Sequence, residues 1–150
     1  MANKLWDKGY SVDGRIEAFT VGNDRVLDLA IAPYDILGTI AHITMLRSVG
    51  LLGQDDLDVL LPELRSLYKD AVDGNLVIEP DVEDIHSQVE LALTRRLGDI
   101  GKKVHTGRSR NDQVLVDLNL YTRARIERTV LKVKGLFSTL QEASERYKDV

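Results

Sequence analysis

The chain has 150 residues with 20 Lys or Arg, 24 Asp or Glu and a formal charge of −4, which allows one ordinary domain with a hydrophobic core. Its 43% hydrophobic and 29% charged content excludes a disordered tail, and no apolar run reaches the roughly 20 residues that a bilayer needs. Lack of cysteine excludes disulfides and thiol nucleophiles, and the acidic balance argues against nucleic-acid or membrane binding. Without a signal-peptide pattern at residues 1–13, a cytoplasmic location is expected.

Two amphipathic helices are predicted in the first half of the chain. Over 33–49, apolar residues recur at spacings of three and four, which places them on one face of a helix that Gly50 ends. The pattern repeats over 54–72, where Pro62 is expected to kink or split the helix because it lacks a backbone donor. The apolar run 76–78 has no second strand with which to pair.

The second half of the chain is predicted to hold a third helix and a very long fourth one. The third begins at Asp81 as its cap, with Asp84 three residues later at the position of a capping box, and it ends at Gly98. After the polar loop 102–110, the fourth runs over 111–147. At 1.5 Å per residue it would be about 55 Å long, whereas a compact globule of this size is roughly 40 Å across.

The apolar stripe of the fourth helix is therefore expected to extend past its own domain. Such a stripe needs cover from helices later in the chain or on a partner subunit, and the chain ends at Val150 without a closing signal. We predict an all-α fold with an N-terminal helical domain, residues 1–110, and the start of a long central-bundle helix, residues 111–150, within a longer protein.

The loop that enters the fourth helix carries the strongest chemical signal. Its sequence HTGRSRNDQ, residues 105–113, combines two arginines, a histidine, two hydroxyls and an amide. Free backbone N–H groups and the helix dipole favour an anion there, and arginine can grip a carboxylate with two hydrogen bonds. The alternative is structural: Asn111 or Ser109 caps the helix, while the arginines are solvated or pair with Asp112 and Asp117. Periodicity alone does not separate the two.

Two other segments hold candidate residues. In EDIH, 83–86, the acid and histidine do not share a helical face in the manner of an i, i+4 metal pair, and the lack of cysteine argues against zinc. Either the acid orients the histidine or a cationic ligand, or the acids favour a helix start and His86 is solvent-exposed. Further upstream, Gly38 would let another helix approach; Asp35 is interpreted as a first-turn acid and His42 as a packed or surface histidine.

Four segments together resemble the N-terminal portion of the argininosuccinate lyase family, within the fumarase/aspartase superfamily. In the family's order, they are KLW at 4–6, YDILGTIAHITML at 34–46, EDIHSQVE at 83–90 and GKKVHTGRSRNDQV at 101–114. The resemblance extends over nearly the whole chain. It implies an all-α homotetramer whose long helices form a central bundle and whose active sites are each assembled from three subunits.

The resemblance also implies a reaction. Family members cleave argininosuccinate reversibly into arginine and fumarate, without a cofactor or a metal, in arginine biosynthesis. A base removes the proton next to a succinyl carboxylate, and negative charge builds on that carboxylate before the guanidinium leaves. Preorganised donors around those oxygens would stabilise the transition state more than the ground state.

The family's residue roles transfer to this sequence by motif. Ser109, Arg110 and Asn111 are expected at the substrate, with Arg110 gripping a carboxylate and Asn111 orienting the substrate through hydrogen bonds. Arg108 and His105 are expected to shape the loop or to support the residues that contact the substrate.

Other family roles fall outside that loop. Asp84 and His86 match the acid and histidine that help to bind or align the substrate, and they are not the proton-abstracting base. In the family the acid and base come from a threonine-histidine pair and from a serine on a mobile glycine-rich loop, both expected after Val150, so the fragment alone should be inactive. Where many members carry a substrate-contacting serine, residues 22–24 contain none, and no contact is assigned there.

Two alternatives stay open at this point. Another fumarate-releasing lyase of the superfamily, such as adenylosuccinate lyase, aspartase or fumarase, would need a similar carboxylate clamp, although HTGRSRNDQ is more similar to argininosuccinate lyases. A non-enzymatic structural or oligomerisation module is the second alternative, since some proteins of the family serve as lens structural proteins. The concentration of Arg108, Arg110, His105 and Asn111 in one loop favours an enzyme.

Overall fold

The computed structural model describes residues 13–150, and this part of the chain is helical without a β-strand, as predicted. The predicted KLW motif lies outside the described residues. The elements are α1 (Gly14–Val21), α2 (Asp24–Leu27), the 3₁₀ helix η1 (Asp28–Ala30), α3 (Ala32–Ser48), α4 (Gln54–Val72), α5 (Ile85–Leu97), α6 (Asp99–Lys102), the 3₁₀ helix η2 (Lys103–His105) and α7 (Arg110–Arg146).

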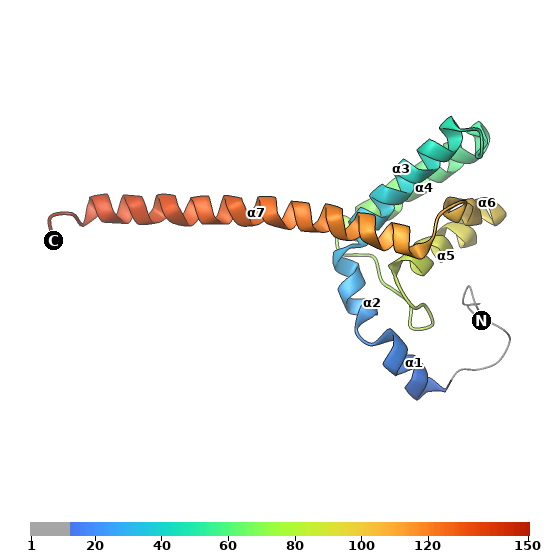
Figure 1. Cartoon of the computed structure of the whole chain (residues 1–150), viewed down its shortest axis with the longest axis horizontal. Helices are drawn as coiled ribbons and strands as arrows, with labels where there is room; N and C mark the ends of the chain where they lie inside the picture. Colours follow the sequence, from blue (N-terminus) through green and yellow to red (C-terminus); the bar gives the residue numbers. More distant parts are fainter. Residues whose placement is uncertain (1–12) are drawn as a thin grey trace.

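Three helices supply most of the hydrophobic core. Helices α3 and α4 form an antiparallel pair, and α5 and α6 pack beside them (Figure 1). Burial of each large aliphatic side chain contributes about 1.5–3 kcal/mol, and this offsets the entropy lost on folding. The most deeply buried core side chains are Ile36, Ile43, Leu46, Leu60, Leu64, Leu67, Ile85 and Leu93.

Helix α4 runs through Pro62 without a break, so the predicted split is wrong. Proline removes the hydrogen bond to the carbonyl four residues earlier, which belongs to Asp58. Both residues are exposed, so water can satisfy that carbonyl. Tertiary packing of Leu60 and Leu64 then holds the helix together on its buried face.

Helix α5 begins three residues later than predicted, because its cap is Asp84 instead of Asp81. The Asp84 side chain accepts a hydrogen bond from the Ser87 amide at 2.8 Å. A second carboxylate, that of Asp28, accepts from the Ile85 amide at 3.1 Å. Two acids therefore satisfy the free amides of the first turn, and one of them comes from 57 residues earlier in the chain.

Helix α6 packs directly on α5 at the buried residue Gly101. A Cβ atom at this position would lie 2.5 Å from backbone atoms of Leu93 and Thr94. We expect Gly101→Ala to lower the free energy of unfolding by about 2–3 kcal/mol, because backbone atoms of a packed helix must move. Urea denaturation of the full-length protein checks this, with Gly14→Ala as the control because nothing lies within 4 Å of Gly14. Equal midpoints for the two variants would contradict the close approach.

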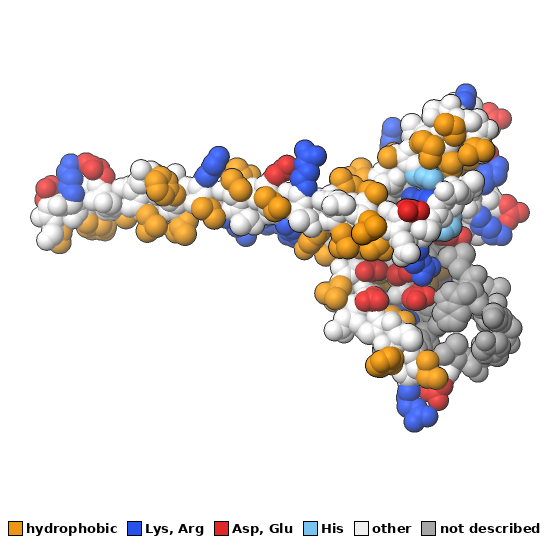
Figure 2. All heavy atoms as spheres, in the orientation of Figure 1, with side chains coloured by type: hydrophobic (Ala, Val, Ile, Leu, Met, Phe, Trp, Pro, Cys, Tyr) orange, Lys and Arg blue, Asp and Glu red, His pale blue; other side chains and the backbone are white. Residues whose placement is uncertain are grey.

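Helix α7 has 37 residues, as the long apolar pattern predicted. Only its first part packs on the body, against α3 at Gly38, where an added Cβ would lie 3.5 Å from Asp117 Oδ1. The rest projects well beyond the other helices (Figure 1), and hydrophobic side chains appear along it (Figure 2). At least 46% of the surface of each of these residues is exposed: Val130, Val133, Leu136, Phe137, Leu140 and Tyr147.

No single helix within residues 13–150 is both long and apolar enough to cross a membrane. Only the pair Asp24–Ala30 and Ala32–Ser48, bent by 67°, reaches that length and composition together.

Candidate active site

Ser109 caps the long helix at the entrance to the site. Its Oγ accepts a hydrogen bond from the Asp112 amide at 3.3 Å, and the Asp112 carboxylate accepts from the Ser109 amide at 2.8 Å. These reciprocal bonds form a capping box and lower the pKa of the Asp112 carboxyl. The capping interpretation is therefore correct for Ser109, while Asn111 lies exposed in the first turn.

Arg110 joins the two motifs that the sequence singled out. Its guanidinium lies 2.8 Å from the Asp84 carboxylate and 3.6 Å from that of Glu83, and it donates a hydrogen bond to Ser87 Oγ at 3.1 Å. The alternative of pairing with Asp112 or Asp117 is wrong for Arg110. The side chain is about one-third exposed, so the first turn of α5 fixes the guanidinium while one side of it stays accessible to a ligand.

Arg108 lies deeper than Arg110. It donates from Nη2 to Thr39 Oγ1 on α3 at 2.9 Å, whereas its buried Nε has no hydrogen-bond partner in the described part of the chain. Burial lowers the pKa of the guanidinium, and the charges of Asp35, Asp117 and Glu90 oppose that shift. An arginine stays protonated under these conditions, so Arg108 brings a positive charge into the interior.

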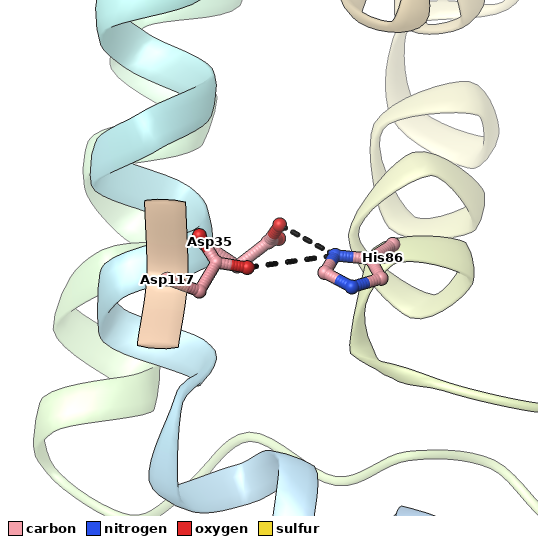
Figure 3. A group of neighbouring side chains, drawn as sticks. All are labelled: Asp35, His86 and Asp117. Atoms are coloured by element: carbon pink, nitrogen blue, oxygen red, sulfur yellow. Dashed lines mark hydrogen bonds and ion pairs between the residues drawn. The ribbon is translucent and has the colours of Figure 1, made fainter. Parts of the chain in front are cut away.

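His86 is buried in a cluster of charged side chains, so the interpretation as a solvent-exposed histidine is wrong. Its Nδ1 lies 2.7 Å from Asp35 Oδ1 and 3.8 Å from Asp117 Oδ2 (Figure 3). Asp35 is in the first turn of α3, as predicted, but it is 1% exposed and also accepts a hydrogen bond from Gln113 Nε2 at 3.2 Å. The acid that orients His86 is thus Asp35, from 51 residues away, instead of the neighbouring Asp84.

Burial and charge act in opposite directions on this cluster. Burial alone would lower the pKa of His86, but the Asp35 hydrogen bond and charge, helped by Asp84 and Asp117, raise it overall. Burial and the nearby Asp35 carboxylate raise the pKa of Asp117 to about 7. Burial likewise raises the pKa of Asp28 in η1. Both the Asp117 carboxyl and the His86 imidazole therefore favour their protonated forms more than they do in water.

The same three side chains have the composition of a metal site but the geometry of a hydrogen-bonded group. Donor atoms of Asp35, His86 and Asp117 lie within 4.8 Å of one another. However, the 2.7 Å separation of His86 Nδ1 from Asp35 Oδ1 is that of a charge-assisted hydrogen bond, and the charge of the Arg108 guanidinium acts on both acids. A divalent cation would have to displace that bond beside a fixed positive charge.

A small cavity that opens to solvent lies between α3, α5 and the loop that enters α7. Its lining is Thr39, His86, Val89, Glu90, Val104, His105, Arg108, Arg110 and Gln113. Two arginines against one acid give the cavity a positive character, which suits an anionic ligand. Burial raises the pKa of that acid, Glu90, while the charges of Arg110 and Arg108 act in the opposite direction.

The cavity brings together four of the seven residues proposed from the sequence, the two histidines and the two arginines. Ser109, Asn111 and Asp84 are outside the lining, although Asp84 holds Arg110. Sequence reasoning missed Thr39, Glu90 and Gln113. Glu90 lies one helical turn after His86 and Gln113 lies three residues after Arg110, so helical periodicity within the two motifs could have identified both.

A histidine outside the cavity secures the loop. His42 Nε2 donates to the Thr106 carbonyl at 2.8 Å, which ties the loop to α3. Burial lowers the pKa of His42, and a neutral imidazole can still make this bond. His42 is partly exposed, which agrees with its interpretation as a packed or surface histidine.

The chain is similar to known proteins along its length. A family model described as Lyase matches residues 13–150. The chain belongs to this lyase family. It is 59% identical over 150 residues to an argininosuccinate lyase of Parabacteroides distasonis and 58% identical over 150 residues to one of Bacteroides fragilis. An argininosuccinate lyase of Thermotoga neapolitana is 41% identical over 147 residues.

The matches extend over most of this lyase chain but only part of each relative. They cover 100% of the chain for the first two proteins and 98% for the third, but 34% to 36% of the relatives themselves. The chain thus spans about a third of the length of these relatives. The resemblance to argininosuccinate lyases is confirmed over the whole of the chain.

The capping role of Ser109 in this lyase chain can be measured separately from any role in binding. We expect Ser109→Ala to lower the free energy of unfolding by about 1 kcal/mol, since the Asp112 amide loses its side-chain acceptor. Urea denaturation of the full-length protein checks this, with Ser66→Ala on the exposed face of α4 as the control. A midpoint unchanged from the parent protein would contradict the capping role.

Proposed function

We propose that this chain is the N-terminal part of an argininosuccinate lyase, which cleaves argininosuccinate reversibly into arginine and fumarate in arginine biosynthesis. The observation that carries the proposal is the positive cavity formed where EDIH meets HTGRSRND. The name shared by relatives 41% to 59% identical supports the same reaction.

Arg110 and Arg108 are the residues that we assign to the succinyl carboxylates. Arg110 is braced by the Asp84 carboxylate and Ser87 Oγ, so its guanidinium needs little reorganisation when a carboxylate binds. Arg108 is held by Thr39. Because both are fixed before the substrate arrives, they can stabilise the negative charge that develops after proton abstraction without paying to order flexible side chains.

The first turn of α7 complements the arginines. The N-terminal end of this 37-residue helix carries the positive end of the helix dipole and free amides. Asn111 lies exposed in that turn, where a ligand can reach it. We assign Asn111 to orienting the substrate by hydrogen bonds and Ser109 to a supporting contact beside its capping role. His105 shapes the loop, Arg108 does so as well as binding a carboxylate, and Asp84 and His86 align the substrate. No cofactor is assigned, and the general acid and base are expected from segments after Val150.

The projecting part of α7 supports a shared assembly. We propose that its apolar residues enter a central helical bundle of a homotetramer, in which residues 111–150 belong to the bundle domain and residues 1–110 to the N-terminal domain. Each active site would then combine segments from several subunits. We further propose a cytoplasmic location, in line with the small, soluble substrate and products of the proposed reaction.

Fumarate release by the full-length protein tests the proposed reaction. Ultraviolet absorbance would follow fumarate formation from argininosuccinate, adenylosuccinate, aspartate and malate in parallel. The proposal predicts release from argininosuccinate only. Release from one of the other three, with none from argininosuccinate, would favour another lyase of the superfamily, and release from none would favour a structural module.

A further inference from the structure

His86 is held at one ring nitrogen by two acids from two other helices. Asp35 on α3 accepts a hydrogen bond from Nδ1 at 2.7 Å, and Asp117 on α7 approaches the same nitrogen to 3.8 Å. Both carboxylates are 1% exposed and His86 is 7% exposed. The three side chains converge from separate elements (Figure 3), so the packing of α3, α5 and α7 sets their geometry.

A structural anchor for His86 would need only one of these acids. Asp35 alone fixes the ring through its short hydrogen bond, and Asp35 also binds Gln113. Both acids leave one buried oxygen, Asp35 Oδ2 and Asp117 Oδ2, without a hydrogen-bond partner in the described part of the chain. An unsatisfied buried carboxylate costs stability. The presence of Asp117 is therefore better explained by what its charge does to its neighbours.

The main effect of that charge falls on His86. With Nδ1–H bonded to Asp35, a neutral imidazole would offer Nε2 as an acceptor, whereas an imidazolium offers Nε2–H as a donor. Two carboxylates beside one ring favour the imidazolium. Nε2 is turned away from both acids (Figure 3), and His86 lines the cavity together with Arg108 and Arg110.

The other charged groups around the cluster come from every element packed on it. Asp28 from η1 and Asp84 from the N-cap of α5 add negative charge near His86 and Asp117. Arg108, from the loop before α7, adds positive charge and favours ionised carboxylates. The acids outnumber the single buried cation, so the surroundings favour a positive His86.

We propose that Asp35 and Asp117 are positioning residues that keep His86 an imidazolium, whose Nε2–H serves as a third cationic donor, beside Arg108 and Arg110, for the substrate's carboxylates. This inference rests on the proposed function. It gives His86 a defined protonation state and gives Asp117, which sequence reasoning treated only as a surface partner for arginine, a role in binding.

The pH dependence of the full-length enzyme tests the proposal. The Asp117→Asn variant removes one carboxylate from the imidazolium and keeps the side-chain shape. We expect the alkaline fall of kcat/KM for argininosuccinate to move to lower pH by about one unit or more, mainly through KM, with near-normal values recovered at lower pH. Asp35→Asn should move it in the same direction, and Asp73→Asn, on the exposed end of α4, should leave it unchanged.

The possible outcomes separate this proposal from the proposed function. A parent enzyme that does not cleave argininosuccinate would overturn both. The proposal alone would be overturned if the parent is active but the alkaline fall of kcat/KM lies at the same pH in Asp117→Asn. A kcat/KM that is lower by the same factor at every pH in this variant would overturn it as well. Loss of folding in both asparagine variants, read by circular dichroism, would assign the acids a purely structural role and would also overturn it.

Discussion

Arg110→Ala in the full-length enzyme is expected to lower kcat/KM for argininosuccinate by at least about a hundredfold, the loss typical for one preorganised donor at a developing anion. Arg110 lines the cavity and is braced by Asp84 and Ser87. The melting temperature should fall by only a few degrees, because the side chain is about one-third exposed and partly exposed ion pairs contribute little stability.

Two further variants make this result specific to Arg110. Arg110→Lys keeps the charge but loses the planar pair of donors, so its activity should lie between those of the parent and the alanine variant. Arg96→Ala removes a partly exposed arginine of α5 that pairs with Glu63 of α4 and does not line the cavity, and it should retain full activity. Steady-state kinetics and thermal melts check all three. A large loss of fold in Arg110→Ala would favour a structural role for this arginine.

Asp117→Asn is expected to stabilise the protein at alkaline pH. The pKa of Asp117 is about 7 in the folded state against 3.8 for an unperturbed aspartate carboxyl, so the native state binds more protons than the unfolded state between these values. Stability therefore falls as pH rises through this window and stays reduced above pH 7. His86, whose pKa is raised, adds a loss in the same direction, because stability gained in its charged form disappears as pH rises.

Asparagine removes the Asp117 part of this pH dependence. The free energy of unfolding of the variant should exceed that of the parent by an amount that grows from pH 4 to pH 8. This difference should reach on the order of 2 kcal/mol after allowance for coupling to His86. Urea midpoints at fixed protomer concentration measure this difference, with Asp73→Asn as the exposed control. A variant that is less stable than the parent at pH 8 would contradict a net cost for the Asp117 charge.

The spacing of apolar residues along the sequence was sufficient to predict the helices that bury one face. The predicted bounds, 33–49 and 54–72, lie within one residue of those of α3 and α4. Apolar side chains at helical spacing form one face, and that face is buried against the core. The length of α7 followed from the absence of proline over 111–147. The Pro62 prediction failed because its backbone defect lies on an exposed face of α4, which water can satisfy.

The centre of the candidate site could not be predicted from local pattern. The Asp35 and His86 side chains are 51 residues apart and Asp35 and Gln113 are 78 apart, so no motif contains such a pair. The start of α5 moved for a similar reason, since Asp28 supplies a cap from 57 residues away. Motif chemistry identified both arginines of the cavity, but their partners depend on how α3, α5 and α7 pack.

A crystal structure of the full-length Arg110→Lys variant with argininosuccinate bound tests the central claim most directly. The account predicts that a succinyl carboxylate lies in the cavity, within hydrogen-bond distance of Arg108 and His86 Nε2. The other carboxylate should face the first turn of α7 near Asn111. A substrate bound in full occupancy elsewhere, with the cavity between α3, α5 and α7 left to solvent, would contradict it.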